Sequence, residues 1–556
     1  MNQRPWVKNY PPGIPANIDT TQYISLVDFL NDCFQRYKSL NAFECMGKKL
    51  TYAEVDSLST QFGAYLHSRG MNPGEKIAIM MPNLLQYPIA VFGALKAGLI
   101  IVNTNPLYTP REMLFQFEDS QVKGIVILDN FCSNLESIIG KTHINTVIVT
   151  SIGELLGGIK GWVTDFVVKK IKRMVPKYHL LNTVNFSHAL TEGKKFKLRN
   201  FQNGPSDVIV HQYTGGTTGV SKGAMLTNEN LVANMLQIRS WMQNYLVEGK
   251  EITLSPLPMY HIFAFSVNCL AMLSYGAHTI LVTNARDINT VIKEFKQNRI
   301  SLMTGINTLF NALLNNEAFE KLDFSSLKIT VGGGMAIQRV VAEKWKRVTG
   351  CPLTEGYGMT ESSPLISVNP LDDTGKMGSI GLPVASTDIR IITDSGTMAS
   401  FGEIGEIQCK GPQVMKGYFN QPTETATTII DNGWLCTGDI GKMDADGFMY
   451  IVDRKKDMIL VSGFNVFPNE IEDIVTMHPK VLEAAAIGVA DEKSGEVVKL
   501  FIVARDKSLT KDEVITYCKT NLTGYKLPKY IEFRDELPKT NVGKILRRAL
   551  KDENAK

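Results

Sequence analysis

The features that define several common protein classes are missing from this sequence. None of its eight cysteines forms a CxxC pair or has metal-site spacing with a histidine, which disfavours a disulfide scaffold and a structural zinc site. The 59 basic and 55 acidic side chains leave a net charge of only +4, which argues against nucleic acid as a partner. No apolar stretch reaches the ~20 residues of a spanning helix, and the N-terminus has no apolar signal core. We therefore expect a cytoplasmic protein, with peripheral attachment to the cytoplasmic membrane face left open.

Strand-like and helical patterns alternate along most of the chain. Lys76–Met81, Gly124–Leu128 and Thr146–Thr150 are short and apolar, as buried strands are, and Pro88–Gly98 has the composition of an apolar helix. This alternation predicts an α/β fold with parallel sheets wrapped by helices. Beyond residue 380, short alternating runs bounded by glycine predict a small β-barrel-like part, and a small α+β unit follows it.

A dense charge run, Asp453–Asp457, separates these last two parts. Its composition fits a solvated loop and also fits a domain boundary. We place the boundary there, which predicts a large N-terminal domain at 1–453 and a small C-terminal domain at 454–556.

Residues 160–178 form a local basic patch. The segment contains six lysines and arginines but only one acidic residue, Asp165, so its local charge is +5. Apolar residues such as Trp162 and Phe166 recur in it at helical spacing. A basic amphipathic helix can lie on an anionic membrane surface. An ordinary surface helix that packs its apolar side on the protein would show the same pattern, so both interpretations stay open.

The most specific motif is the string from Tyr213 to Gly223, which is rich in glycine and threonine and carries one lysine, Lys222. A strand pattern leads into it and a helical pattern follows. Glycines let the backbone approach a ligand, and exposed N–H groups, hydroxyls and a lysine suit phosphates. The order Ser-Lys-Gly near its end is not that of a Walker A loop, which needs Gly-Lys-Ser or Gly-Lys-Thr.

This string resembles the phosphate loop of the adenylate-forming superfamily, which includes acyl-CoA synthetases, luciferases and peptide-synthetase adenylation domains. Further motifs similar to those of the family follow in the family's order, over nearly the whole chain. They are Pro258–His261 near the acyl site, Gly356–Glu361 for adenine and magnesium, Thr437–Asp439 for ribose, Asp453–Lys456 at the hinge and Asn541–Lys544 with the C-terminal lysine.

A closer resemblance is to bacterial long-chain fatty acid–CoA ligases of the beta-oxidation type. Asn432–Asp439 with the charge run is similar to the fatty acyl-CoA synthetase signature, and Gly332–Met335 and Val461–Val466 match as well. One position departs from the pattern, because these ligases usually have histidine where this chain has Cys436. We assign Cys436 no catalytic role.

The resemblance implies a ligase that forms a carbon–sulfur bond in two steps, with ATP, Mg²⁺ and coenzyme A. A fatty carboxylate first attacks the α-phosphate of ATP to give an acyl-adenylate and pyrophosphate, and the coenzyme A thiol then displaces AMP. Positive groups must offset the repulsion between a carboxylate and a polyanion. The implied catalytic residues are Lys222, His261, Thr360, Glu361 and Lys544, and the implied magnesium ligands are Thr214 and Glu361.

The implied nucleotide contacts come from several loops. Tyr357 would stack on adenine, and Asp439 would accept hydrogen bonds from both ribose hydroxyls. His261 is either a gate beside the acyl-adenylate or a packed histidine. The other implied binding residues are Gly215, Gly216, Thr217, Thr218, Gly332, Gly333, Gly334, Met335, Glu355, Gly356 and Arg454.

In the family the C-terminal domain rotates between the two steps, and its hinge maps to Lys456. Rotation would withdraw Lys544 and bring a second loop to coenzyme A. That loop consists of Ser462, Gly463, Phe464 and Asn465. We expect the acyl pocket among residues 260–273, 304–314 and 332–335, which are rich in apolar side chains. Core packing predicts the same composition, so the preferred length of the fatty acyl chain cannot be read from these segments.

Other functions stay open. A fatty acyl-AMP ligase that stops at the adenylate often carries an insertion that blocks rotation, and none stands between residues 320 and 460. A luciferase-like oxygenase is disfavoured by the closer resemblance. A nucleotide or lipid sensor should lack one of the key polar residues, whereas Lys222, Glu361, Asp439 and Lys544 are all present. Relatives include homodimers, so we expect a homodimer.

Overall fold

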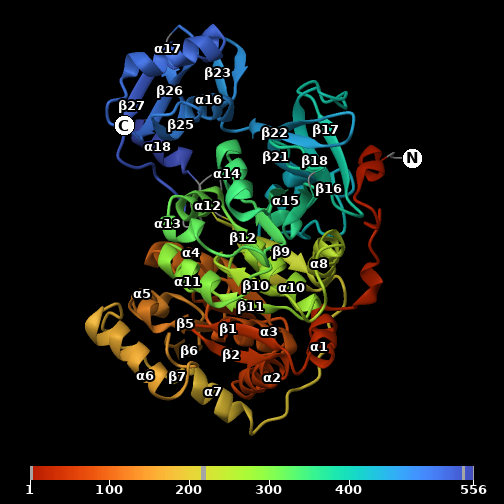
Figure 1. The fold of residues 1–556 in the computed structure, drawn as a ribbon. Coiled ribbons are helices and arrows are strands. Elements are labelled where there is room, and N and C mark those ends of the chain that lie inside the picture. Colours follow the sequence, from red (N-terminus) through yellow and green to blue (C-terminus); the bar gives the residue numbers. More distant parts are fainter. Residues whose placement is uncertain (1–3, 215–220, 373, 492, 541–544, 555–556) are drawn as a thin grey trace.

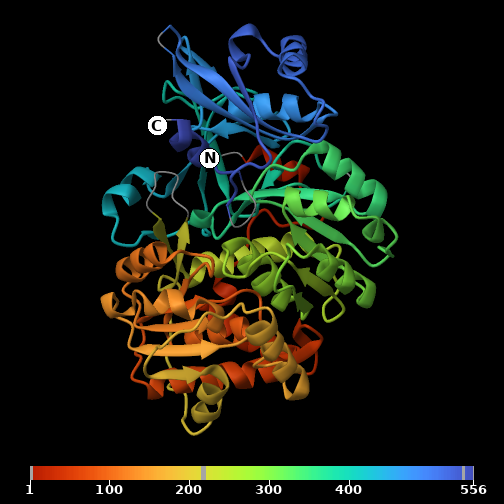
Figure 2. The same cartoon turned by 90° about the vertical axis from the view of Figure 1, so that its left-hand side faces the viewer.

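The computed structural model describes residues 4–214, 221–372, 374–491, 493–540 and 545–554. Two large sheets stacked with helices form the lower body of the molecule, a smaller sheet lies above them, and the C-terminal unit sits on top (Figures 1 and 2). The predicted α/β class is confirmed. Among the described residues no helix is both long and apolar enough to cross a bilayer.

The first large sheet is mainly parallel. Its central strands are apolar on both faces, as β5 and β6 show with every residue buried, because helices cover both sides. In spatial order it consists of β19 (Gly417–Tyr418), β9 (Lys222–Thr227), β8 (Val208–Thr214), β4 (Ile100–Asn103), β3 (Lys76–Met80), β5 (Gly124–Leu128), β6 (Thr146–Thr150) and β7 (Thr183–Asn185).

The second large sheet is parallel at its centre and antiparallel at both edges. In spatial order it consists of β16 (Leu382–Pro383), β15 (Leu365–Val368), β14 (Leu353–Gly358), β13 (Ile329–Gly332), β12 (Leu302–Gly305), β10 (Ile252–Ser255), β11 (His278–Leu281), β1 (Asn41–Cys45) and β2 (Lys48–Thr51).

Helices α1 (Leu26–Arg36), α2 (Tyr52–Ser68), α3 (Gln86–Lys96) and α8 (Asn228–Met242) contribute to one continuous core with strands of both sheets. Helix α3 is buried along its whole length, and Gly93 lets it approach α2 closely, since a Cβ there would lie 2.6 Å from the Ser59 carbonyl oxygen. Lys96 ends α3, and contacts of its buried ammonium with Asp56 Oδ1 at 2.5 Å and Ser59 Oγ at 2.9 Å offset the cost of removing the charge from water.

The helices have the following bounds: α1 Leu26–Arg36, α2 Tyr52–Ser68, α3 Gln86–Lys96, α4 Pro110–Ser120, α5 Cys132–Glu136, α6 Gly158–Phe166, α7 Phe186–Gly193, α8 Asn228–Met242, α9 Ile262–Ala264, α10 Met272–Ser274, α11 Ile288–Gln297, α12 Asn307–Leu314, α13 Glu317–Glu320, α14 Arg339–Thr349, α15 Pro422–Thr428, α16 Pro468–Thr476, α17 Lys511–Asn521 and α18 Arg547–Asn554. A π-helical turn, η5 (Val167–Ile171), continues α6, and a second, η6 (Phe265–Ala271), joins α9 to α10.

Two smaller sheets complete the chain. The third sheet has β17 (Asp388–Ile392), β18 (Gly405–Lys410), β21 (Trp434–Met443) and β20 (Ile429–Ile430), with β22 (Met449–Arg454) paired to β21. The fourth has β24 (Phe464–Val466), β23 (Ile459–Val461), β26 (Gly495–Ala504) and β25 (Val481–Asp491), with β27 (Tyr530–Phe533) paired to β26.

The strand and the helix predicted on either side of the phosphate loop are both present, as β8 and α8. The sequence did not indicate the strand between them, because Lys222 begins β9, which pairs antiparallel with β8. Helix α8 starts only at Asn228, after this strand. The described flanks of the loop therefore belong to a β-hairpin, and no helix N-terminus follows the loop directly.

Candidate active site

A cavity of about 830 Å³ lies where the sheets meet below the C-terminal unit. Strands β8, β13 and β14 end at its wall, in agreement with the rule that open α/β sheets bind ligands beyond the carboxyl ends of their strands. Segments from 103 to 546 line the cavity, so residues far apart in the sequence share one space.

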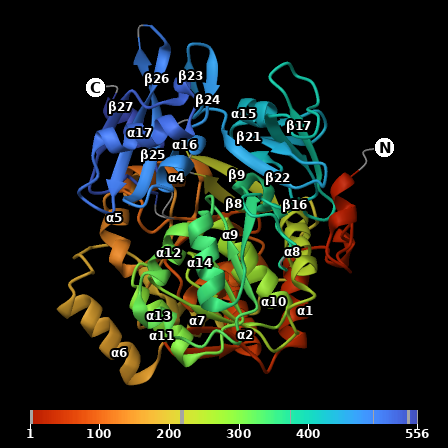
Figure 3. The same ribbon diagram turned by 45° about the horizontal axis from the view of Figure 1, so that its top comes forward.

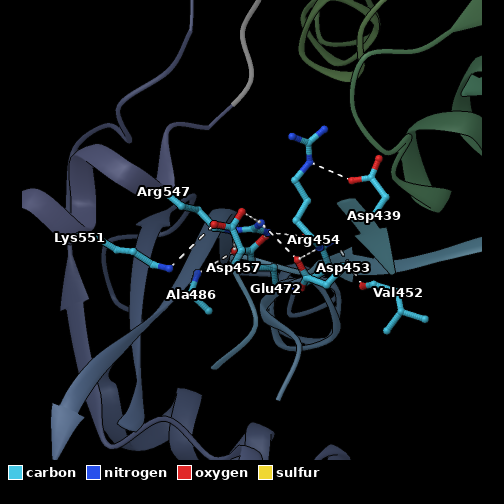
Figure 4. A network of polar contacts seen from close by, with 10 residues as sticks. Asp439, Val452, Asp453, Arg454, Asp457, Glu472, Ala486, Arg547 and Lys551 are labelled. Atoms are coloured by element: carbon cyan, nitrogen blue, oxygen red, sulfur yellow. Dashed lines mark hydrogen bonds and ion pairs between the residues drawn. The ribbon is translucent and has the colours of Figure 1, made fainter. Parts of the chain in front are cut away.

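Tyr357, Asp439 and Arg454 form one polar corner of the site. The Tyr357 hydroxyl donates to Asp439 Oδ2 at 2.6 Å. Arg454 Nε lies 3.0 Å from the other oxygen of this carboxylate, Asp439 Oδ1 (Figure 4 shows this ion pair). A carboxylate has about four lone-pair sites, so the buried Asp439 can still accept hydrogen bonds from a ligand diol. The hydrogen bond fixes the Tyr357 ring as part of the wall.

Lys222, Tyr418 and Glu361 form a second polar corner. Tyr418 donates to Glu361 Oε1 at 2.6 Å, and the Lys222 ammonium lies 5.3 Å from the centre of the Tyr418 ring and pairs with Glu424. Burial raises the pKa of Glu361 above its usual range, and the hydrogen bond from Tyr418 opposes that rise. The corner thus holds a cation and a carboxylate side by side.

The oxygen donors of this second corner fit a magnesium ion. Thr214, at the end of β8, and Glu361 both line the cavity. Within the described part of the chain, no three His, Cys, Asp or Glu side chains cluster as a metal site by themselves. Magnesium in such sites takes one or two protein ligands and completes its shell with water and substrate phosphates, and this donor set suits that arrangement.

His261 lines the cavity at the start of α9, where its Nδ1 accepts from the Phe263 N–H at 3.3 Å. Burial lowers its pKa to about 4, so the imidazole is neutral near pH 7. A neutral ring can gate the space beside it but carries no charge to stabilise a phosphate.

Apolar side chains that belong to one core cluster line another part of the cavity. The expected pocket segments supply Ile262, Phe263 and Val267, but the sequence did not indicate the contribution from α8. The missed residues of this cluster are Ile238, Trp241, Met242, Val331, Val368 and Leu371. The apolar spacing of α8 was a signal for burial, and burial in a core and exposure to a cavity look alike in a sequence.

The C-terminal unit closes the cavity from above. Lys539, Thr540 and Leu546 line it, and a β-bridge joins Lys539 to Ile545. The hairpin of β23 and β24 lies elsewhere: its residues 462–465 are exposed, and Phe464 stacks on Tyr525 with ring centres 4.8 Å apart.

The comparisons with known proteins agree with this arrangement. The model of the AMP-binding enzyme family matches residues 30–419, and that of the AMP-binding enzyme C-terminal domain matches residues 470–544. The chain belongs to the AMP-binding enzyme family. A long-chain-fatty-acid–CoA ligase of Escherichia coli (strain CFT073) is 52% identical over 99% of this chain and 98% of its own length. A protein of the same name from Haemophilus influenzae is 50% identical, over 99% and 98%.

A solved structure supports the fold of this AMP-binding enzyme. The anthranilate CoA ligase in complex with anthranoyl-AMP superposes with a TM-score of 0.85 at 24% identity, over 97% of this chain and 99% of that one. At this identity the likeness concerns the fold alone.

The predicted site residues of this AMP-binding enzyme fall into three groups. Those that line the cavity are Thr214, Lys222, His261, Gly333, Gly334, Gly356, Tyr357, Thr360, Glu361 and Arg454, and Asp439 joins them through its two partners. Those placed away from the cavity wall are Gly332, Met335, Glu355, Lys456, Ser462, Gly463, Phe464 and Asn465. Those outside the described residues are Gly215, Gly216, Thr217, Thr218 and Lys544.

Tyr418 is a further residue that the sequence did not reveal, and its hydroxyl gives a sharp prediction. Tyr418→Phe keeps the ring against Lys222 but removes the donor that orients Glu361. We expect the half-saturating magnesium concentration to rise about tenfold, with kcat near normal at saturating magnesium, because partners of metal ligands typically contribute that much affinity. Magnesium titration of ATP turnover measures this.

Tyr275→Phe is the matched control for this variant. Tyr275 is also buried, and it donates to the Arg239 carbonyl at 2.7 Å, outside the cavity lining. A Tyr418→Phe enzyme that is slower at every magnesium concentration, with unchanged half-saturation, would limit Tyr418 to a packing role.

Proposed function

We propose that this chain is an ATP-dependent long-chain fatty acid–CoA ligase that releases pyrophosphate and AMP. The observation that carries the proposal is that one cavity joins the two polar corners to the apolar wall of Trp241 and Met242. Such a space accommodates a nucleotide and an aliphatic chain together, with the reacting carboxylate between them. The curated relatives bear the name of this activity.

The chain's own residues would divide the first step between them. Lys222 would bind the β- and γ-phosphates as a point charge with three donors. Thr360, which lines the cavity beside Glu361, would contact the α-phosphate. Magnesium held at Glu361 and Thr214 would neutralise phosphate charge when bound. Lys544 would stabilise the attacked α-phosphate, and Gly215–Thr218 would complete the phosphate loop.

The second step requires space for coenzyme A. His261, neutral because burial lowers its pKa, would open and close the passage between adenylate and thiol. No strong base is needed there, since thiols ionise appreciably near neutral pH.

We further propose that the domain after residue 453 rotates about Lys456 between the steps. Lys539, Thr540 and Leu546 face the cavity while the hairpin at 462–465 is exposed, which suits the first step. Ser462 and Gly463 form the two-residue turn of this hairpin with φ of 50° and 84°. Rotation would exchange the two loops and bring Gly463 to the pantetheine arm, where a side chain would obstruct it.

A steady-state assay tests the function. The purified protein receives ATP, Mg²⁺ and a fatty acid, from octanoate to oleate, with and without coenzyme A, while pyrophosphate, AMP and thioester are followed separately. We expect coenzyme-A-dependent AMP and thioester with palmitate as a good substrate. Trapped acyl-adenylate with no thioester would favour an acyl-AMP ligase, and no turnover at any chain length would favour a sensor.

We also propose that the protein binds the cytoplasmic membrane face through α6 and η5, which lie at the edge of the molecule (Figures 1 and 3). Polar residues of this segment face the protein: Asp165 accepts from Ser151 Oγ at 2.6 Å, and Lys169 lies 2.9 Å from the buried Asp129. Apolar residues face outward, with Trp162 68% and Ile159 82% exposed. An ordinary surface helix packs its apolar side on the protein, so the outward orientation of these side chains supports the membrane proposal.

Vesicle co-sedimentation tests the membrane surface. We expect the wild-type protein to bind vesicles of phosphatidylcholine with phosphatidylglycerol, and Lys170→Glu with Lys172→Glu to lose at least about tenfold in affinity, because each basic residue near an anionic surface contributes about 1 kcal/mol. Trp162→Ser with Phe166→Ser should lose binding too, since the two exposed rings stack 5.5 Å apart and form the apolar face.

Met398→Ser with Phe401→Ser, two exposed apolar residues outside this segment, is the control. Equal vesicle binding by all variants would remove the segment from the proposal. The expected homodimer is tested separately by light scattering in solution.

A further inference from the structure

A cluster of polar and charged residues surrounds the proposed hinge (Figure 4), and none of its members lines the cavity. Its centre is Arg547, the first residue of α18, whose side chain is only 14% exposed. We call Arg547, Asp453, Asp457, Glu472 and Asn469 the hinge cluster. Arg547 binds Glu472 through two nitrogens at 2.8 and 2.6 Å, and its third lies 3.4 Å from Asp457 and 3.6 Å from Asp453.

Asp453 connects this cluster to the N-terminal domain. It belongs to β22, which pairs with β21 of the third sheet, and it is fully buried. Its Oδ2 accepts from the Asn469 N–H at 2.7 Å, and Asn469 Nδ2 donates to the Val452 carbonyl at 3.4 Å. Because Asn469 and Arg547 lie after the hinge and Asp453 before it, these contacts cross the proposed boundary.

Arg547 also directly follows a residue that lines the cavity. Leu546 lines the cavity and donates its N–H to the Pro538 carbonyl at 2.8 Å. One turn along α18, Lys551 lies 3.9 Å from Asp457, so two residues of the same helix face contact the hinge segment. Any movement of α18 relative to Asp453 therefore also moves Leu546 at the cavity wall.

Adjacent residues of β22 link the hinge cluster to the polar corner formed by Tyr357, Asp439 and Arg454. Asp453 faces Arg547, whereas Arg454 faces Asp439 at 3.0 Å. Rotation about Lys456 would break the contacts of Asp453 with Arg547 and Asn469 but leave Arg547 paired with Glu472, which lies in its own domain. Arg547 therefore keeps a carboxylate partner in both orientations and is not left as an unpaired buried charge.

We propose that Arg547 is a positioning residue, which holds the C-terminal domain over the cavity for adenylate formation by binding Asp453 across the hinge. The proposal rests on the domain rotation described above. Interactions that couple two orientations typically change their ratio by about 5- to 150-fold. Loss of the contact should therefore slow the first step and leave the second intact.

Two variants weaken the contact from opposite sides. Asp453→Asn removes the charge but keeps an oxygen for the Asn469 N–H. Arg547→Lys keeps the charge but loses the fork that reaches Glu472 and Asp453 together. We expect each to slow palmitoyl-adenylate formation at least about fivefold, whereas thioester formation from supplied palmitoyl-adenylate stays at the wild-type rate. Arg534→Lys is the control, because Arg534 pairs with Glu532 and Glu553 within the C-terminal domain.

A distance measurement separates this inference from the rotation itself. Spin labels at Ser395→Cys and Ser508→Cys, both exposed, report the distance between the domains by pulsed electron paramagnetic resonance, with Cys436→Ser in every sample because the other native cysteines are buried. Palmitoyl-sulfamoyl-adenosine, without and with coenzyme A, supplies the two states.

In the labelled parent we expect one distance without coenzyme A and a different one with it. In the Asp453→Asn variant, the distance distribution should shift toward the one seen with coenzyme A even before coenzyme A is added. Two distances in the parent with unchanged populations in both variants would overturn the role of Arg547 while keeping the rotation. A single distance under all conditions would overturn the rotation and, with it, this inference. Equal slowing of both half-reactions would also contradict the proposal, since that is the effect of a general folding defect.

Discussion

Glu361→Gln is expected to lower the kcat/KM for ATP at least about a hundredfold, or about 2.7 kcal/mol of transition-state stabilisation. Glu361 is 6% exposed and fixed by Tyr418, with its backbone carbonyl bound to the Met415 N–H at 2.8 Å. The amide keeps the shape of the side chain, so the fold should survive. It lacks the negative charge that a hard divalent cation requires of its few protein ligands.

Adenylate formation at increasing magnesium measures this effect. Activity should recover partly at high magnesium, because the phosphates still bind the ion. Glu251→Gln is the control for loss of a buried carboxylate, since Glu251 pairs with Lys328 at 2.6 Å away from the cavity. A Glu361→Gln enzyme with wild-type magnesium dependence would contradict the assignment of Glu361 as a ligand.

Asp439→Asn is expected to raise the KM for ATP about thirtyfold or more, because hydrogen bonds to a buried charged group contribute about 1.5–3 kcal/mol each. The variant also leaves Arg454 without its ion pair at 3.0 Å. The KM for palmitate should stay unchanged, since Asp439 contacts the polar corner only.

Discrimination against 2′-deoxy-ATP gives the sharper readout for Asp439. The wild-type enzyme should prefer ATP strongly, and Asp439→Asn should reduce that preference, because the acceptor for the 2′-hydroxyl is weakened. A variant that binds ATP weakly but keeps the full preference would place the effect on Tyr357 and Arg454 rather than on a ribose contact.

The parallel framework could be predicted well because strands buried on both faces form nearly continuous apolar runs in the sequence. Gly124–Leu128 and Thr146–Thr150 have the bounds that the sequence predicted. The motif residues Tyr357 and Glu361 also meet the end of β8 as expected, since the carboxyl ends of the strands meet at one cavity.

Other features depend on contacts that no local pattern encodes. Tyr418 reaches Glu361 because β19 pairs with β9, and the sequence does not specify pairing between strands that lie so far apart. The periodicity of α6 defines two faces but not which one meets the protein. Asp165 and Lys169 decide that, through partners at Ser151 and Asp129 that only the fold reveals.

The central claim is that one cavity forms an acyl-adenylate and then passes the acyl group to coenzyme A. Its most direct test is a pulse–chase at enzyme concentrations near those of the substrate. The protein is first incubated with labelled palmitate, ATP and Mg²⁺, and enzyme-bound palmitoyl-adenylate is quantified before coenzyme A and excess unlabelled palmitate are added. We predict nearly stoichiometric adenylate, whose label passes to palmitoyl-CoA, with one AMP released for each thioester formed from labelled or unlabelled palmitate. Adenylate that stays bound or hydrolyses to palmitate when coenzyme A is added would contradict the account.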